Sequence, residues 1–198
     1  MSSTMKSFLD GYNDPRLGIF FQKNFVSGKY ASRRNGMLAS DLNLSSNANA
    51  QQSNVGTYWL SYSAATTYAQ NLAARQHIMG AAESYFLRAE GALNGWAMGG
   101  TAQSLYEKGI SVSLKQWGVT SDAAVTEYIN STNLPTQPGD YNTSPAVSTT
   151  PIKWATSEAV QRKQIGTQKW LAIFSGRMGG MVGIQTDRIP RFISCISL

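Results

Sequence analysis

Apolar and polar positions alternate most regularly between Ile78 and Val119. In the first half of this stretch, the apolar residues recur at steps of three and four, which places them on one face of a helix. They are Ala82, Tyr85, Phe86, Ala89 and Leu93. The second half repeats the spacing with Ala102, Leu105, Tyr106, Ile110, Leu114 and Trp117. Glycines between the halves predict a tight connection, so we expect an antiparallel helical hairpin.

Residue types at its ends delimit the second helix of this hairpin. Thr101 is a suitable N-cap, because its side chain can accept a hydrogen bond from a free backbone N–H. Gly118 follows the last apolar position and ends the helix. Trp96 and Trp117 flank the helix, and we interpret both as packing between the two hairpin helices.

Two further helices are predicted after the hairpin. Ser121 or Asp122 caps a short helix with Val125 and Tyr128 on one side. Residues 154–174 form a final helix, which Gly166 weakens by up to about 1 kcal/mol relative to alanine.

The remaining segments carry weaker patterns. Residues 1–60 are predicted to be irregular, with a short strand at 17–21 and a possible partner strand containing Phe25, Val26 and Tyr30. Residues 40–57 are polar and low in complexity, which predicts a long surface loop. Residues 131–151 hold four of the six prolines and predict a second long loop.

Composition narrows the classes of function. Charged residues make up 14% of the chain, and the formal charge of +6 is spread along it rather than clustered. We therefore expect no nucleic-acid partner. His77 and Cys195 are the only histidine and cysteine, which excludes a disulfide framework and a His-paired metal site. We expect no cofactor and no bound metal.

The sequence contains no recognisable catalytic motif. It has no phosphate-binding loop, no nucleophile elbow and no zinc-protease motif. Asp10, Asp14 and Asp41 are isolated carboxylates, whereas Glu83 and Glu90 lie seven residues apart on a predicted helix. Catalysis by a carboxylate pair stays open as an alternative. We favour solvated faces and helix caps for these residues, and no enzymatic activity.

Aromatic residues gather among small polar ones at 58–77. Tyr58, Trp59 and Tyr62 are candidate stacking platforms, because the apolar faces of sugars pack on aromatic rings. The alternative is that these rings pack beneath the polar loop. Candidate hydrogen-bond donors to the same ligand are Arg33, Arg34 and Asn35.

Several runs of residues resemble the SusD/RagB-like family of nutrient-binding outer-membrane lipoproteins. The hairpin carries AESYFLRAE at 82–90 and GWAMGGTA at 95–102. Flanking runs agree in order, namely NDPRL at 13–17 and IGTQKW at 165–170. The similarity spans about residues 10–174.

This resemblance implies a mainly α fold with tetratricopeptide-like helical hairpins and long irregular loops. It also implies a non-enzymatic, lipid-anchored protein at the bacterial cell surface. Such proteins capture glycans or other nutrients and deliver them to a TonB-dependent (SusC-like) transporter. Family members are two to three times longer, so we expect residues 1–174 to be a C-terminal portion of the fold. The signal and the lipid-bearing cysteine are expected outside this sequence.

The tail departs from the family after Phe174. Family members continue as FP-x-G-x-E-x-W-x-E-x-RRTGYP, whereas this chain reads SGRMGGMVGIQTDRIPRFISCIS. A one-base frameshift accounts for the difference, because Met178 before Gly179 and Met181 before Val182 each force a Trp codon in the shifted frame. On this hypothesis, residues 175–198 are a poorly ordered, out-of-frame tail. If so, the frameshift rather than the native reading frame accounts for four residues of this tail, namely Arg177, Arg188, Arg191 and Cys195.

The leading hypothesis is therefore binding of an oligosaccharide, or another nutrient, at the cell surface. A second hypothesis is a helical-repeat module that binds a protein. A third is a glycan-cleaving enzyme, which requires two carboxylates positioned in a cleft.

Overall fold

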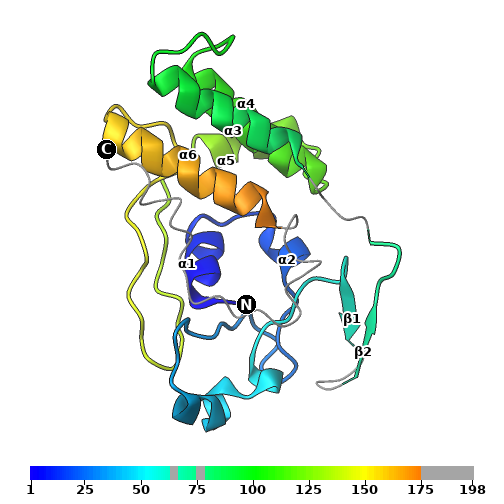
Figure 1. Cartoon of the computed structure of the whole chain (residues 1–198). Coiled ribbons are helices and arrows are strands. Elements are labelled where there is room, and N and C mark those ends of the chain that lie inside the picture. Colours follow the sequence, from blue (N-terminus) through cyan, green and yellow to red (C-terminus); the bar gives the residue numbers. More distant parts are fainter. Residues whose placement is uncertain (63–66, 75–78, 175–198) are drawn as a thin grey trace. The chain divides into compact units, whose positions relative to one another are not determined.

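The computed structural model of the chain describes residues 1–62, 67–74 and 79–174. These residues form two compact units (Figure 1). The described residues of unit 1 are 1–62, 67–74 and 133–149, and those of unit 2 are 79–132 and 150–174. His77 and the expected out-of-frame tail, including Arg177, Arg188, Arg191 and Cys195, lie outside the described residues.

Unit 2 is built from four helices. They are α3 (Ala81–Leu93), α4 (Ala102–Gln116), α5 (Asp122–Ile129) and α6 (Glu158–Ala172). Helices α3 and α4 form the expected antiparallel hairpin, shown in green in Figure 1. Helix α6 packs against both of them, and α5 packs against α4. The prediction of a mainly α fold with a helical hairpin is confirmed.

The core of unit 2 is centred on aromatic contacts between α3 and α4. Phe86 and Tyr106 are fully buried, with ring centroids 6.2 Å apart in an edge-on arrangement. The Tyr106 ring also packs on Trp154, 5.0 Å away, and its hydroxyl donates to the Ile152 carbonyl at 2.7 Å. A backbone hydrogen at Gly109 leaves room for the Phe86 ring, because a Cβ there would lie 2.8 Å from it. The apolar face predicted from the spacing is therefore the buried face.

The predicted helix ends of unit 2 agree with the structure at three positions. The Thr101 hydroxyl accepts a hydrogen bond from the Ser104 N–H at 3.1 Å, and the Ser121 hydroxyl accepts one from Ala124 at 3.3 Å. Gly118 has a φ of +86°, the left-handed conformation that favours glycine just after a helix.

Helix α6 begins later than the predicted 154–174 helix. Its first residue is Glu158. The preceding segment is held in a non-helical course by the buried Gln164 side chain, which donates to the carbonyls of Pro151 and Lys153 at 3.0 and 2.6 Å. These backbone carbonyls bond to a side chain instead of to a helical turn.

The two tryptophans of the hairpin have different surroundings. Trp117 is buried, as predicted. Trp96 is 62% exposed, so the prediction that it packs between the helices is wrong. The cause is the end of α3 at Leu93. Two residues later, Gly95 has a φ of +79° and turns the chain. Trp96 consequently lies on the connecting loop, next to Gly91.

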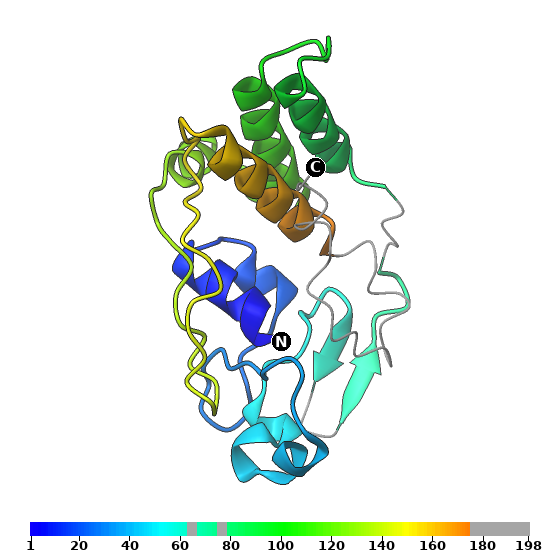
Figure 2. The ribbon, with the colours of Figure 1, turned by 60° about the vertical axis from the view of Figure 1, so that its left-hand side comes forward.

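Unit 1 contains short elements joined by irregular chain. Its helices are α1 (Ser3–Gly11) and α2 (Leu17–Phe20), and its strands are β1 (Leu60–Tyr62) and β2 (Tyr68–Gln70). Three 3₁₀ turns lie between them, η1 (Ala39–Asn43), η2 (Ser45–Asn47) and η3 (Asn49–Gln51). The views in Figures 1 and 2 show α1 between the 133–149 segment and β1.

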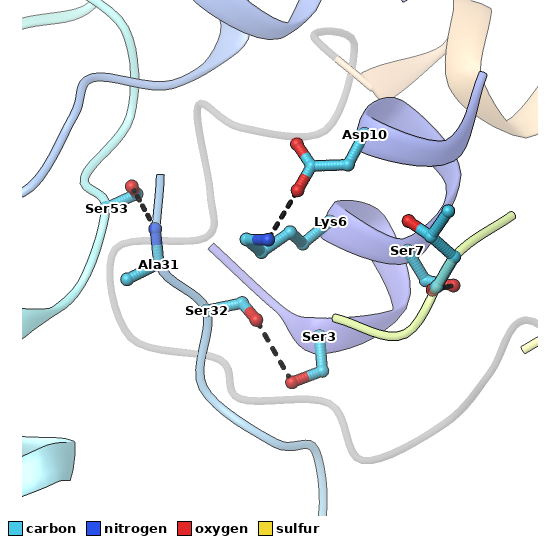
Figure 3. Close-up of polar contacts among 8 residues, drawn as sticks. Ser3, Lys6, Ser7, Asp10, Ala31, Ser32 and Ser53 are labelled. Atoms are coloured by element: carbon cyan, nitrogen blue, oxygen red, sulfur yellow. Dashed lines mark hydrogen bonds and ion pairs between the residues drawn. The ribbon is translucent and has the colours of Figure 1, made fainter. Parts of the chain in front are cut away.

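Helix α1 corrects the prediction that residues 1–60 are irregular. Met5, Phe8, Leu9 and Tyr12 are all buried, and their spacing puts them on one side of a helix. The opposite side is polar and makes its own contacts. Figure 3 shows Lys6 paired with Asp10 along α1, while the Ser3 hydroxyl meets that of Ser32 at 3.3 Å.

The predicted strand at 17–21 is also wrong, because Leu17–Phe20 is helical. Phe21 alone forms an antiparallel bridge, with Val55. The expected partner around Phe25, Val26 and Tyr30 is a turn, stabilised by the Asn24 side chain, which accepts from the Ser27 N–H at 2.7 Å. The two strands of the described structure are β1 and β2, which pair antiparallel from Leu60↔Gln70 to Tyr62↔Tyr68.

The polar 40–57 segment is held by side chains that bond to the backbone. The amide of Asn47 donates to the Asp41 carbonyl at 2.8 Å, and that of Gln52 donates to Ser46 at 2.7 Å. Asn47, Gln52 and Ser53 are buried. This segment is therefore a loop, as predicted, but one whose polar side chains form part of the interior of unit 1.

Asp14 and Arg16 form an ion pair with no exposed side-chain surface on either partner. Nη2 of Arg16 lies 2.6 Å from Oδ2 of Asp14, and the Arg16 Nε and backbone N–H both donate to Oδ1 at 2.9 Å. The expectation that the isolated carboxylates are solvated is wrong for Asp14. Burial raises the pKa of neighbouring Tyr12, and the Asp14 charge adds to this effect.

Two helical glycines provide a matched test of the unit 2 core. We expect Gly109→Ala to lower the free energy of unfolding by about 1–3 kcal/mol, because the new methyl overlaps the Phe86 ring. Gly166→Ala has open space around it and is expected to raise that free energy by about 0.5–1 kcal/mol. Urea unfolding followed by circular dichroism measures both. Equal stability of the two variants would contradict the packing.

A second pair of variants tests the buried ion pair. We expect Asp14→Asn to lower the free energy of unfolding by about 3–5 kcal/mol, because Arg16 then keeps a buried charge without its counter-charge. The matched control is Asp122→Asn, which breaks an ion pair with Lys115 whose side chains are 85% and 48% exposed. Solvent screens this pair, so unfolding should be unchanged. A similar small effect from both substitutions would refute the role of Asp14.

Candidate functional site

All six residues predicted to bind ligand lie in unit 1, in two groups. Tyr58, Trp59 and Tyr62 lie just before or within β1. Arg33, Arg34 and Asn35 lie in the segment between α2 and η1. The two groups are positioned by different neighbours.

In the aromatic group, Tyr58 and Trp59 are half-buried. The two rings meet edge-on with centroids 5.2 Å apart, and Trp59 also packs on the buried Phe20, 6.4 Å away. Asn71 fixes the backbone of these two residues. Its side-chain amide donates to the Tyr58 carbonyl and its backbone N–H donates to the Trp59 carbonyl, both at 2.9 Å. Trp59 thus has a packed side and an accessible part. Tyr62 pairs with Tyr68 at the end of β1.

Arg33 is tied to the loop of 3₁₀ turns. Its guanidinium donates to the Asn47 carbonyl, and to the side-chain oxygen of Asn49 at 3.0 Å. Its backbone bridges to Ser2 in parallel. Burial lowers the pKa of the guanidinium. These bonds orient the chain that carries the next two residues.

Arg34 and Asn35 are exposed. The Asn35 amide donates to the Thr4 hydroxyl at 3.3 Å. Arg34 lies beside Tyr141, whose hydroxyl donates to Oδ2 of Asp41 at 2.7 Å. The hydrogen bond to Asp41 raises the pKa of Tyr141, whereas Arg34 acts in the opposite direction. Arg34, Asp41 and Tyr141 therefore form one polar cluster.

Sequence reasoning did not identify Tyr141 as a site residue, and Asp41 was interpreted as a solvated carboxylate. Tyr141 belongs to a proline-rich loop without periodicity and lies 100 residues from Asp41. The local signal was the turn sequence Gly139-Asp140, in which Gly139 has a φ of +65°. That signal predicts a turn and does not predict what the turn contacts.

Asp140 holds this turn in place. Its carboxylate accepts from the Ser3 hydroxyl at 2.8 Å, and from the N–H groups of Ser144 and Asn142 at 3.0 and 3.2 Å. Burial acts to raise the pKa of Asp140. The hydrogen bonds from Ser144, Ser3 and Asn142 outweigh burial and hold the pKa below its ordinary value of 3.8.

Two further kinds of site were sought among the described residues. In residues 1–62, 67–74 and 79–174, no three His, Cys, Asp or Glu side chains come together in a way that suits a metal ion. Within the same ranges, every helix is too short or too polar to cross a membrane. The chemistry available at the candidate site is therefore that of aromatic rings, carboxylates, amides and guanidinium groups.

Comparison with family models gives one match, to the SusD-like family described as Susd and RagB outer membrane lipoprotein, over residues 1–178. No protein of curated function matches the chain.

Solved structures are similar over most of the chain. A chitin-binding SusD homolog from Flavobacterium johnsoniae is 34% identical, with a TM-score of 0.68 over 88% of this chain. A SusD homolog from Bacteroides vulgatus is 31% identical, with a TM-score of 0.69 over 87%. A SusD-like protein from Bacteroides thetaiotaomicron is 27% identical, with a TM-score of 0.63 over 93%. The matched region is 34%, 34% and 36% of those chains, respectively, so this chain spans about a third of their length.

The anchoring role of Asp140 can be tested by pH. Because its pKa is lower in the folded chain, its contribution is complete above about pH 4 and is lost as the pH falls through the folded pKa. We expect Asp140→Asn to lower the free energy of unfolding at pH 7 by about 1–3 kcal/mol. The variant should also lose less stability than wild type between pH 4 and pH 2.5. Parallel pH profiles for the two proteins would rule out this role.

Proposed function

The chain belongs to the SusD-like family of Susd and RagB outer membrane lipoproteins, and we propose that it takes part in binding an oligosaccharide at the cell surface. The supporting observation is its 34% identity, over 88% of its length, to a chitin-binding SusD homolog. The ligand class proposed for this chain is accordingly a neutral oligosaccharide, with N-acetylglucosamine oligomers as the first candidates.

The residues proposed to contact this ligand lie in the two groups of unit 1. Tyr58 and Trp59 are half-buried rings on a fixed backbone, which suits stacking against a sugar face. Tyr62 extends this group within β1. Arg33, Arg34 and Asn35 supply hydrogen-bond donors, of which Arg34 and Asn35 are exposed.

We further propose that the bound oligosaccharide is delivered, uncleaved, to a TonB-dependent outer-membrane transporter of the SusC type. The family description as outer membrane lipoproteins supports the proposed location at the outer membrane. Binding without turnover agrees with the partners of two carboxylates of unit 1, since Asp14 pairs with Arg16 and Asp41 accepts from Tyr141. These carboxylates stabilise the fold or position a side chain.

A second candidate function is a helical module that binds a protein. It is favoured by one observation on the hairpin of unit 2, where Leu87 and Trp96 are 52% and 62% exposed. Tryptophan is enriched among the residues that dominate the binding energy of protein interfaces, which makes the exposed Trp96 the basis of this candidate.

Two tryptophan variants discriminate between these functions. Isothermal titration of the 198-residue chain with N-acetylglucosamine hexamer, and with cellulose and starch hexamers, should give saturable binding to at least one of them. We expect Trp59→Ala to weaken that binding about ten-fold or more, because a stacking surface is removed. Trp96→Ala is the matched control and should bind as wild type does.

Three results would contradict the proposal. They are the absence of binding to every oligosaccharide, release of shorter sugars during incubation, and loss of binding in Trp96→Ala with Trp59→Ala unaffected. The last of these would favour the hairpin as the contact surface.

A further inference from the structure

We propose that Arg34, Asp41 and Tyr141 form a separate subsite that binds one sugar residue of a neutral oligosaccharide. The inference rests on the proposed function, which already includes Arg34, and adds to it Tyr141 as a second aromatic platform and Asp41 as a hydrogen-bond acceptor. None of the three residues is part of the Tyr58–Trp59 group.

Arg34, Asp41 and Tyr141 meet although they come from distant parts of the sequence. The three residues come from three segments of unit 1, which are the chain after α2, the turn η1 and the 133–149 segment. The Tyr141 hydroxyl donates to Asp41 at 2.7 Å, and Arg34 reaches the same hydroxyl. In both views of the ribbon, the turn of the 133–149 segment lies beside the chain that leads into η1 (Figures 1 and 2).

Each of the three segments is also held in place by hydrogen bonds outside the cluster. Tyr141 follows Asp140, whose carboxylate is bonded to Ser3 on α1. The Asp41 carbonyl accepts from the buried Asn47 side chain. Arg34 follows Arg33, whose guanidinium is tied to the η2–η3 region. Groups that are already ordered lose little conformational entropy when they bind a ligand.

The cluster presents an aromatic ring beside one hydrogen-bond acceptor and one hydrogen-bond donor. The Tyr141 side chain is half-buried, and its orientation is set by the bond from its hydroxyl to Asp41. Asp41 has a carboxylate that accepts hydrogen bonds from hydroxyl groups, whereas Arg34 donates to hydroxyl or carbonyl oxygens. An aromatic face beside one acceptor and one donor matches the apolar face and the hydroxyl edge of a pyranose ring.

The charges of the cluster favour a neutral sugar. Arg34 brings one positive charge, and Asp41 brings one negative charge next to the same hydroxyl. Because these opposite charges cancel, the cluster has no net charge with which to attract an ionised sugar. A neutral sugar, including an N-acetylated one, can use both groups as hydrogen-bond partners.

The subsite is distinct from the aromatic group near β1. In both ribbon views, α1 lies between β1 and the 133–149 segment. Tyr58 and Trp59 contact Phe20 and Asn71, whereas Tyr141 contacts Asp41 and Arg34. Substitutions in the two places should therefore have independent effects on the binding free energy.

The experiment is a titration of the 198-residue chain with N-acetylglucosamine hexamer, or with the hexamer found to bind wild type. Tyr141→Ala is expected to weaken binding about ten-fold or more, and Asp41→Asn about three-fold or more. Tyr141→Phe keeps the ring and should lose less than Tyr141→Ala. The matched control is Tyr85→Ala, which removes a half-buried tyrosine of unit 2 and should leave binding unchanged. Tyr141→Ala combined with Trp59→Ala should multiply the two losses.

Each outcome decides the question. If wild type binds and Trp59→Ala weakens binding, but Tyr141→Ala and Asp41→Asn bind normally, the subsite is overturned and the proposed function stands. If wild type binds no oligosaccharide, both are overturned. If Tyr141→Ala fails to fold, the milder variants decide, and full binding by both Asp41→Asn and Tyr141→Phe overturns the subsite.

Discussion

The buried ion pair between Asp14 and Arg16 is the constraint on which the loop-rich unit depends. Removing two charges from water costs several kcal/mol per ion, so such a pair persists only when its hydrogen bonds are complete. Here one backbone and two side-chain N–H groups of Arg16 reach the same carboxylate. The same requirement extends through unit 1, whose elements are short. The side-chain amides of Asn47 and Gln52 donate to the backbone carbonyls of Asp41 and Ser46, which lie in short 3₁₀ turns. Polarity in this part of the chain is thus a condition of folding.

Hydrophobic spacing predicted the fold wherever apolar positions recur over several turns. The faces of α3 and α4, the caps at Thr101 and Ser121 and the stop at Gly118 all follow from local rules. Helix α1 was missed because it is nine residues long and serine-rich, so its pattern is brief. Residues 17–21 were assigned to a strand from composition alone, although their packing produces a helical turn. Trp96 was assigned to the core because spacing cannot show where a loop leaves the helix axis.

The candidate site was only partly accessible to sequence reasoning. Residue type proposes Tyr58 and Trp59 as stacking candidates without a structure, and it leaves open the alternative that these rings pack beneath the polar loop. The neighbourhood of Arg34 depends on a tertiary contact across 100 residues, and no local pattern encodes such a contact. The burial of Asp14 likewise could not be predicted from the sequence. Its neighbour Arg16 is visible in the sequence, but the burial of both side chains is decided by the surrounding fold.

The bond between Ser3 and Asp140 joins residues 137 positions apart, and residues 75–132 of unit 2 lie within the intervening sequence. Contacts of such high sequence separation form late, because they close long loops, whereas the α3–α4 hairpin needs only neighbouring residues. The Lys153 N–H donates to the Ser131 carbonyl at 2.9 Å, so the chain that leaves unit 2 at 133 returns beside its point of departure. Once unit 2 has formed, residues 131 and 153 are held together, so the loop that carries Tyr141 runs only between these two points. From this connectivity we expect the hairpin to form first and the polar cluster of unit 1 last, once the chain as far as residue 149 is present.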